Sequence, residues 1–142
     1  MIAVDSNILV YAHKRDAPFH AEAKAALAGL VSSADTWAIP WPCLHEFFAV
    51  VTNPRVFIPA STPAQAIAQL QAWTSAPNVR LLSEGHHHLA QLTSLVLPRL
   101  AGPAVHDAKI AAICLDHGVR ALLTMDRDFS RFPALKTRSL LA

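Results

Sequence analysis

Short apolar runs recur along the chain, and segments with helical spacing of their apolar positions separate them. The run Ile2–Val4 is too short for a helix, and its β-branched residues favour a buried strand. Similar runs predict further strands at 36–39, 79–82 and 121–124, and residues 136–139 predict a fifth.

Between the strands, apolar residues recur at steps of three and four, which is typical of amphipathic helices. The helices are expected to begin near Ser6 and at Pro18, Pro42, Pro63, about His86 and Ala104. The fifth is expected to run from about 86 to 100, and its inward positions are Leu89, Leu92, Val96 and Leu100. The sixth ends at Gly118, which is expected to cap it. Strands that alternate with helices predict a three-layer α/β/α sandwich with a mainly parallel central sheet, and residues 1–142 are expected to form a single domain.

The composition supports one globular core. The chain has 142 residues, of which 53% are hydrophobic and 15% charged, and this balance excludes a disordered protein and indicates that a partner covers some apolar surface. Cys43 and Cys114 are isolated in apolar surroundings, which predicts reduced core cysteines rather than a disulfide framework or a zinc site. With no apolar stretch of transmembrane length and no secretory pattern at its start, we expect a soluble, cytoplasmic protein.

An acid follows the first predicted strand. Asp5 stands between that strand and a helix start, and ligands of open α/β sheets bind in the crevice outside the carboxyl ends of the strands. Asp5 is therefore a candidate catalytic group, and a plain helix N-cap is the alternative.

Two further acids lie on predicted helices: Glu46 on the helix after the second strand, and Asp107 on the helix before the fourth. Glu46 stands among apolar residues, and a carboxylate on a buried helix must be paired, protonated or bound to metal. Asp107 shares a helix face with Ile110, Ala111 and Cys114 and so begins a core stripe. A favourable interaction with the helix N-terminus is the alternative for both acids.

Asp126 and Asp128 follow the fourth predicted strand. One of them can cap a short helix at 129–131 while the other points into a pocket, and we assign Asp126 to a metal site and Asp128 to its support. Three or four carboxylates are thus expected at one edge of the sheet, where they repel one another unless cations neutralise them. Oxygen-only ligands suit Mg²⁺ or Mn²⁺, and the chemistry that fits is a metal-dependent nuclease.

Four segments in this order resemble the PIN-domain family and, within it, the VapC-type toxins of bacterial toxin–antitoxin pairs. These segments are Val4-Asp5-Ser6-Asn7-Ile8-Leu9, Glu46 in a helix after a strand, His106-Asp107-Ala108-Lys109-Ile110-Ala111-Ala112, and Thr124-Met125-Asp126-Arg127-Asp128-Phe129. The resemblance spans essentially the whole chain and implies a PIN fold and an endoribonuclease that hydrolyses single-stranded or structured RNA with Mg²⁺, or Mn²⁺ in its place.

The resemblance also implies roles for individual residues and for partners. The acidic quartet would be Asp5, Glu46, Asp107 and Asp126. Asn7 and Thr124 would orient it, and Asp128 would be a supporting acid or an additional ligand. Family membership further implies a homodimer and a small antitoxin that covers the groove. Candidate contact surfaces lie around Tyr11 and Phe19 and at residues 56–58, although these side chains fit a core as well.

Several alternatives remain open from the sequence. A non-catalytic PIN scaffold that binds RNA or protein is the second reading, and a Mg²⁺-dependent phosphatase the third. An aspartyl-nucleophile phosphatase would need Asp-x-Asp after the first strand, whereas this chain has Asp5-Ser6-Asn7. His86, His87 and His88 are read as a helix start because consecutive helical side chains diverge. The tryptophans Trp37, Trp41 and Trp73 can stack on bases, but core packing is the favoured interpretation.

Overall fold

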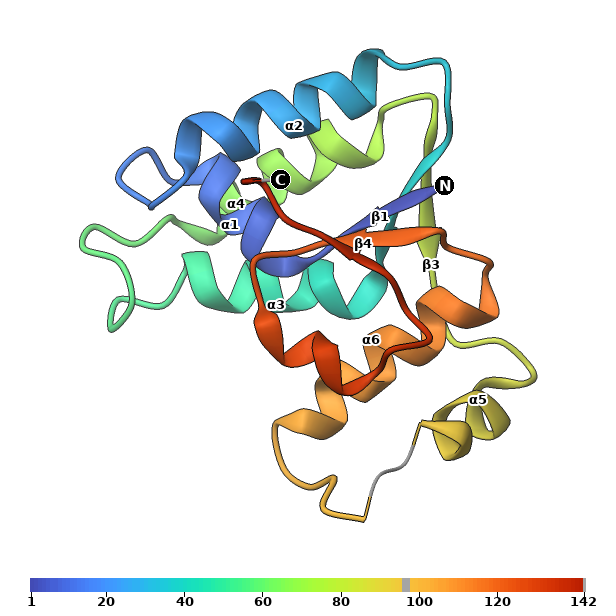
Figure 1. The fold of residues 1–142 in the computed structure, drawn as a ribbon. Helices are drawn as coiled ribbons and strands as arrows, with labels where there is room; N and C mark the ends of the chain where they lie inside the picture. Colours follow the sequence, from blue (N-terminus) through green and yellow to red (C-terminus); the bar gives the residue numbers. More distant parts are fainter. Residues whose placement is uncertain (96–97, 142) are drawn as a thin grey trace.

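A single parallel sheet forms the centre of the molecule. The computed structural model describes residues 1–95 and 98–141 (Figure 1). The strands are β1 (Ile2–Val4), β2 (Trp37–Pro40), β3 (Val79–Leu82), β4 (Ala121–Leu123) and β5 (Thr137–Arg138). All neighbouring pairs are parallel and the order is β3-β2-β1-β4-β5, so the predicted parallel sheet with its fifth strand is confirmed.

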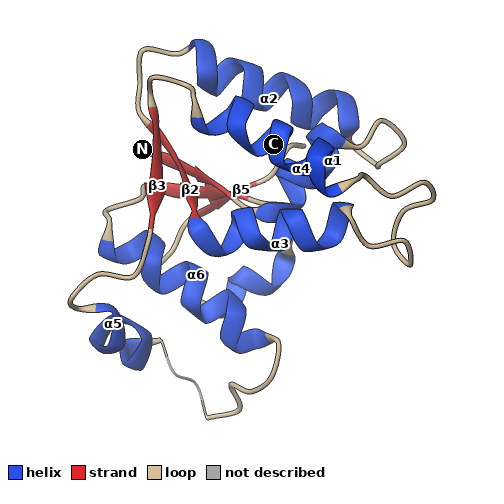
Figure 2. Ribbon diagram, turned by 180° about the vertical axis from the view of Figure 1, so that it is seen from behind, coloured by secondary structure: helices blue, strands red, loops and turns tan. Residues whose placement is uncertain are grey.

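Helices cover both faces of the sheet. They are α1 (Ser6–His13), α2 (His20–Ser32), α3 (Trp41–Val51), α4 (Pro63–Thr74), α5 (His88–Ser94) and α6 (Ala104–Asp116), with a 3₁₀ helix η1 (Arg127–Arg131). Figures 1 and 2 show α2 and α4 on one side of the sheet and α5 and α6 on the other. This arrangement confirms the three-layer α/β/α prediction.

The three inner strands, β2, β1 and β4, are buried along their whole length. Every residue of β1 and β4 is buried, because helices cover both faces of a parallel sheet and its inner strands become continuously apolar. The largest fully buried side chains, which surround these strands, include Trp37, Phe47, Phe129 and Phe132. Cys43 and Cys114 are buried and free, as predicted.

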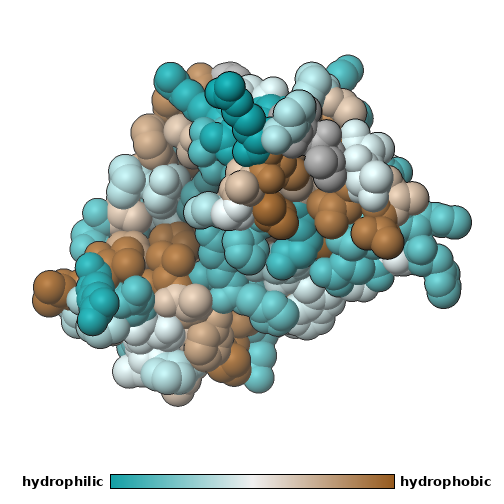
Figure 3. All heavy atoms as spheres, turned by 90° about the horizontal axis from the view of Figure 1, so that it is seen from below, coloured by the Kyte–Doolittle hydropathy of each residue, from teal (hydrophilic) through white to brown (hydrophobic). Residues whose placement is uncertain are grey.

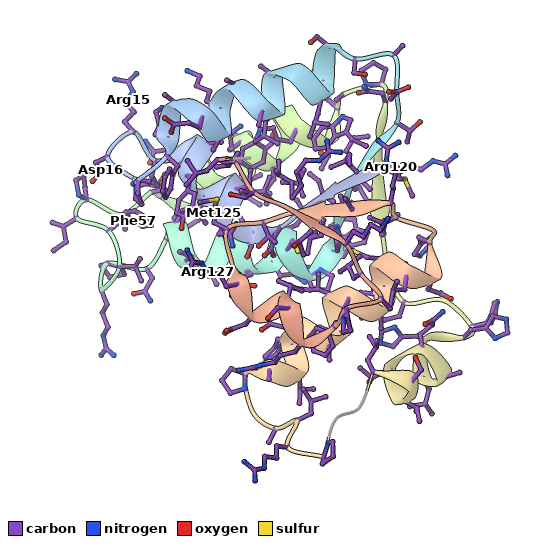
Figure 4. All side chains as sticks on the ribbon, in the orientation of Figure 1. Arg15, Asp16, Phe57, Arg120, Met125 and Arg127 are labelled. Atoms are coloured by element: carbon purple, nitrogen blue, oxygen red, sulfur yellow. The ribbon has the colours of Figure 1, made fainter. Side chains whose placement is uncertain are left out.

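The strand order creates a crevice beside β1. From β1 the chain moves outward to β2 and β3, and it then crosses back to place β4 on the other side of β1. In such sheets the point where the order reverses is where ligands bind, outside the carboxyl ends of the strands. Asp5 follows β1 and Thr124 follows β4, so both lie at this point. Figure 4 shows Met125 and Arg127 at this end of β4 and Arg120 at the opposite end.

The prediction of one long helix over residues 86–100 is wrong. Helix α5 covers only His88–Ser94, and Val96 lies outside the described residues. The hydroxyls of Thr93 and Ser94 donate to backbone carbonyls of the preceding turn at 2.7 and 2.6 Å, which competes with continuation of the helix. Leu89, expected to face inward, is 74% exposed.

Two other helix ends follow from backbone conformation. Phe19 has φ 58°, which does not fit a right-handed helix, so α2 begins at His20 and not at Pro18. After α6, Gly118 has φ 68° and the amide of Val119 donates to the carbonyl of Cys114 at 2.9 Å, which is the bond of a glycine C-cap. The predicted cap is confirmed. No helix within the described ranges combines the length and apolar character needed to cross a membrane.

Candidate active site

Asp5 is held rigidly at the start of α1. It is the N-cap residue, only 3% exposed, and its Oδ1 accepts a hydrogen bond from the backbone amide of Ser6 at 2.8 Å. The backbone amide of Asp5 itself donates to the carbonyl of Leu123 at 3.0 Å, which continues the pairing of β1 with β4. The N-cap reading of Asp5 is confirmed, and the acid also stands at the carboxyl end of β1, where the catalytic reading requires it.

Thr124 connects the ends of the neighbouring strands β1 and β4. Its side chain is buried, and its Oγ1 donates to Asp5 Oδ2 at 2.7 Å. The same oxygen accepts hydrogen bonds from Asn7 Nδ2 at 3.2 Å and from the amide of Asp126 at 3.0 Å. Asn7 also donates to Asp5 Oδ2 at 3.3 Å and accepts from the amide of Met125 at 3.2 Å. Asn7 and Thr124 thus orient one buried carboxylate and the turn after β4.

Burial raises the pKa of Asp5 above its usual value. Removal from water is the largest cause, while the hydrogen bonds from Thr124 and Ser6 act in the opposite direction. The negative charge of Glu46 raises the pKa further, which indicates that these two acids belong to one electrostatic neighbourhood.

Three other carboxylates come together beside this network. Asp107 from the first turn of α6, Asp126 and Asp128 each offer an oxygen, and these oxygens lie within 4.8 Å of one another. Asp126 caps η1, because its Oδ1 accepts a hydrogen bond from the amide of Asp128 at 2.8 Å. The capping acid Asp126 and Asp128, two residues later, thus both lie close to Asp107.

The crowding of acids is strongest at Asp107. Partial burial and the charges of Asp126, Asp5, Asp128 and Glu46, in this order of size, raise its pKa from 3.8 to about 6. At neutral pH the cluster is thus under electrostatic stress that a cation would relieve.

Glu46 lines the same pocket as this cluster, and it is exposed, which corrects the expectation of a buried carboxylate. The buried face of α3 consists of Cys43, Leu44, Phe47 and Val51. The other faces of α3 are not covered by protein although they carry apolar residues, since Trp41 and Ala49 are exposed as well. The pocket of about 560 Å³ is lined by Pro42, His45, Glu46, Ala49, Pro103, His106, Asp107, Lys109, Ile110, Asp126 and Asp128.

The comparisons with known proteins agree with this architecture. The PIN domain pattern matches residues 2–135. The chain belongs to the PIN-domain family. The ribonuclease VapC43 of Mycobacterium tuberculosis is 34% identical over 139 residues, which cover 97% of this chain and 94% of the relative.

Solved structures share the fold of this PIN domain. The VapC20 toxin of Mycobacterium tuberculosis has a TM-score of 0.68 at 20% identity, with 92% of this chain and 93% of that chain covered. VapBC-1 from nontypeable Haemophilus influenzae has a TM-score of 0.70 at 18% identity and 100% coverage of both chains.

The acids of this PIN domain fit a hard divalent cation. The close group contains carboxylate oxygens alone, which are the donors that Mg²⁺ and Mn²⁺ prefer. It comprises Asp107, Asp126 and Asp128, whereas Asp5 and Glu46 are not part of it. Asp5 accepts hydrogen bonds from Ser6, Asn7 and Thr124, and Glu46 lines the same pocket as the three acids.

Several residues around the acids were not assigned by sequence reasoning. Ser6 and Cys43 contact Asp5, with Cys43 Sγ 3.5 Å from Oδ1, and the nearby acid adds to the burial that raises the thiol pKa well above its usual value. His45 and Lys109 line the pocket. Consecutive helical side chains diverge, so the position of His45 next to Glu46 does not predict that both line one pocket. Contacts between separate elements, such as that of Cys43 with Asp5, leave no local signal either.

The substitution Thr124→Val tests the network. It removes the donor to a buried carboxylate, so we expect the free energy of unfolding to fall by about 1–3 kcal/mol and the pKa of Asp5 to rise. Urea unfolding of metal-free protein at neutral pH measures the first effect, and NMR titration of the carboxyl carbon measures the second. Thr137→Val, at an exposed strand position, is the matched control. Equal effects of the two substitutions would refute the network.

A pH series with Asp107→Asn tests the electrostatic stress. Because the folded pKa of Asp107 is raised from 3.8 to about 6, the folded state binds more protons than the unfolded state in this window. The stability of metal-free wild type is therefore expected to fall as the pH rises from about 4 to about 6, relative to Asp107→Asn. Unfolding in EDTA across this range measures the difference, with Asp35→Asn as a control at an exposed acid. Parallel stability curves for wild type and Asp107→Asn would contradict the shift.

Proposed function

We propose that this PIN domain is a metal-dependent endoribonuclease that hydrolyses phosphodiester bonds of RNA and acts as the toxin of a toxin–antitoxin pair. The observation that carries the proposal is the group of three carboxylates beside the buried Asp5, at the crevice between β1 and β4. The relatives named as VapC ribonucleases support the same activity.

The resident cation in this proposal is Mg²⁺, with Mn²⁺ as a substitute. Asp107, Asp126 and Asp128 would hold it, together with Asp5 and Glu46 as the remaining acids of the site. When bound, such an ion polarises the phosphodiester and activates a water as the nucleophile. Whether one or two ions bind depends on how far Asp5 and Glu46 take part.

The residues of the chain supply position and charge. Thr124 and Asn7 keep the Asp5 carboxylate in a single orientation, which fixes one side of the site without reorganisation during the reaction. Asp107 must lose its proton to hold a cation, and its pKa is raised to about 6 in the metal-free protein, so we expect occupancy and activity to fall together as the pH is lowered. Lys109 and His106 line the same pocket, and Lys109 offers positive charge to a phosphate.

The proposed substrate is single-stranded or structured RNA. The VapC20 toxin, which shares the fold, is described as cleaving the sarcin–ricin loop, and this supports RNA as the substrate class. RNA as substrate implies action in the cytoplasm. The sequence cut by this chain depends on the groove around the acids and not on the acids themselves.

The proposed partners are a small antitoxin and a second copy of the chain. Structures with the same fold include DNA-bound VapBC of Salmonella typhimurium and VapBC-1 of Haemophilus influenzae, which supports an antitoxin. The loop after α3 offers apolar surface for a partner, since Val56 is 53% and Ile58 88% exposed. Tyr11 and Phe19 are half-buried and contact one another, with ring centroids 6.1 Å apart. A short reading frame directly upstream of the gene would support the pair.

A non-catalytic scaffold is the alternative, and a phosphatase is a weaker one. A scaffold has no need for mutually repelling acids. Their repulsion raises the pKa of Asp107 and destabilises the charged cluster, and a cation bound there would offset this destabilisation. The hydrogen-bonded pair of Asp5 and Asn7 leaves no second acid after β1 for phosphatase chemistry of the aspartyl type.

Cleavage of a mixed-sequence single-stranded RNA tests the function. We expect purified wild type to cut it with Mg²⁺ or Mn²⁺, and EDTA to abolish cutting. Asp5→Asn and Asp126→Asn are each expected to lower the rate by more than about 100-fold, because they remove charge that holds or orients the cation. The exposed Asp35→Asn is the matched control and should cut like wild type.

Two results would count against this function. Equal cutting by wild type and Asp5→Asn would identify a contaminating nuclease. If nothing cuts, calorimetric titration with Mn²⁺ decides between the alternatives: binding that Asp126→Asn abolishes keeps the metal site and leaves the substrate open, while no binding by wild type favours the scaffold.

A further inference from the structure

A second groove lies on the other flank of α3. It has a volume of about 500 Å³ and is lined by Trp41, Leu44, His45, Phe48, Ala49, Ile67, Leu70, Gln71 and Thr74. It shares His45 and Ala49 with the acidic pocket, so α3 forms the crest between the two hollows, and the small side chain of Ala49 lies on this crest. Figure 3 shows that apolar residues gather in separate patches between hydrophilic ones on the face that it views.

Trp41 is the unusual side chain of this groove. Core packing was predicted for all three tryptophans, and this is confirmed for Trp37 and Trp73, which are 1% and 8% exposed. For Trp41 it is wrong, because this side chain is 42% exposed. Trp41 is the first residue of α3 and follows β2, the strand next to β1, so it lies one strand away from Asp5 along the edge that holds the site.

The aromatic surface extends toward the acids. The ring centroids of Trp41 and His45 are 5.9 Å apart with an interplanar angle of 36°, and His45 also lines the acidic pocket. An exposed aromatic pair beside a pocket for phosphodiesters is the arrangement on which bases of single-stranded nucleic acid stack.

The groove also offers polar groups beside its apolar walls. Thr74 Oγ1 donates to the carbonyl of Leu70 at 2.8 Å and keeps its lone pairs free to accept. Gln71 is exposed, and no side-chain hydrogen bond of Gln71 occurs within the described residues. A nucleobase has flat apolar faces, which suit the mainly apolar lining, and a polar edge, for which Gln71 and Thr74 are the available partners.

We propose that a nucleobase flanking the scissile phosphodiester crosses the α3 crest at Ala49 and stacks on Trp41, with Gln71 and Thr74 facing its polar edge. This rests on the proposed ribonuclease function and assigns the recognition of one nucleotide to a surface separate from the acids. Trp41 is then a substrate-binding residue, and the reaction at the carboxylates does not require it.

Cleavage kinetics provide the first test. With a single-stranded RNA whose cut site has been mapped, Trp41→Ala should lower kcat/KM by about 5- to 150-fold, mainly through KM, because stacking is lost equally in the bound substrate and the transition state. Trp41→Phe should restore much of the loss. Leu89→Ala removes an exposed apolar side chain on α5 and should behave like wild type. An abasic nucleotide at the stacking position should slow wild type by a similar factor and leave Trp41→Ala unaffected.

Tryptophan fluorescence in EDTA provides the second test, because it needs no cutting. Trp37 and Trp73 are buried, so quenching by added RNA reports on Trp41. We expect a mixed-sequence RNA to quench wild type, whereas Trp41→Phe should show no quenching. Inorganic polyphosphate, which has charge but no bases, should leave the emission of both unchanged.

The outcomes separate this inference from the proposed function. If Trp41→Ala cuts and binds RNA like wild type, the inference is overturned, the ribonuclease stands, and the groove is left to a protein partner. Quenching without cutting by any variant would support the stacking site, and the Mn²⁺ titration then decides whether the acids hold a metal. A mixed-sequence RNA that does not quench wild type overturns the stacking site, whatever the cleavage assay gives.

Discussion

The hydrogen bond from Thr124 to Asp5 is the contact on which the site depends. It connects the residue after β1 to the residue after β4, and these strands are far apart in sequence and adjacent only because the chain crosses back over the sheet. The parallel pairing of the two strands brings the donor to the acceptor, and the hydrogen bond in turn adds to those from Ser6 and Asn7 that satisfy the buried carboxylate. The strand pairing and the site therefore stabilise each other at this point. A substitution that shifts β1 or β4 is expected to move the Asp5 carboxylate as well.

The acids place an opposing demand on the fold. Burial and mutual repulsion raise the pKa values of Asp5 and Asp107, so the apo protein holds charge that its own core does not stabilise. A parallel sheet buried on both faces supplies enough apolar contact to tolerate this. Asp107 and Asp126 lie at element starts, where a capping hydrogen bond or the helix N-terminus favours a negative charge. The local role of each acid thus reduces the cost of assembling the group.

The sequence predicts those parts of the molecule that follow from local pattern. Strand runs, helix starts and the strand-end positions of Asp5 and Asp126 are local, and the parallel fold follows from their alternation. Exposure is different, because it depends on what packs against a helix. Glu46 and Trp41 lie on a helix that reads as apolar all round, yet α3 is covered on one face only. Helix α5 is shorter than the apolar spacing predicts. That spacing continues past Ser94, but the hydroxyls of Thr93 and Ser94 bind backbone carbonyls where the helix ends.

In the proposed function, helix α3 serves catalysis on one flank and base recognition on the other. One flank contributes Glu46 to the acidic pocket, and the other contributes Trp41 to the apolar groove. Substitutions on the groove flank can change which base is preferred without altering the carboxylates, because no groove residue other than His45 and Ala49 lines the acidic pocket. Two chains with the same acids can then cut different RNAs. In this proposal the electrostatic requirement is met by acids that follow β1 and β4 and begin α6, while base preference depends on shape and stacking along one flank of α3.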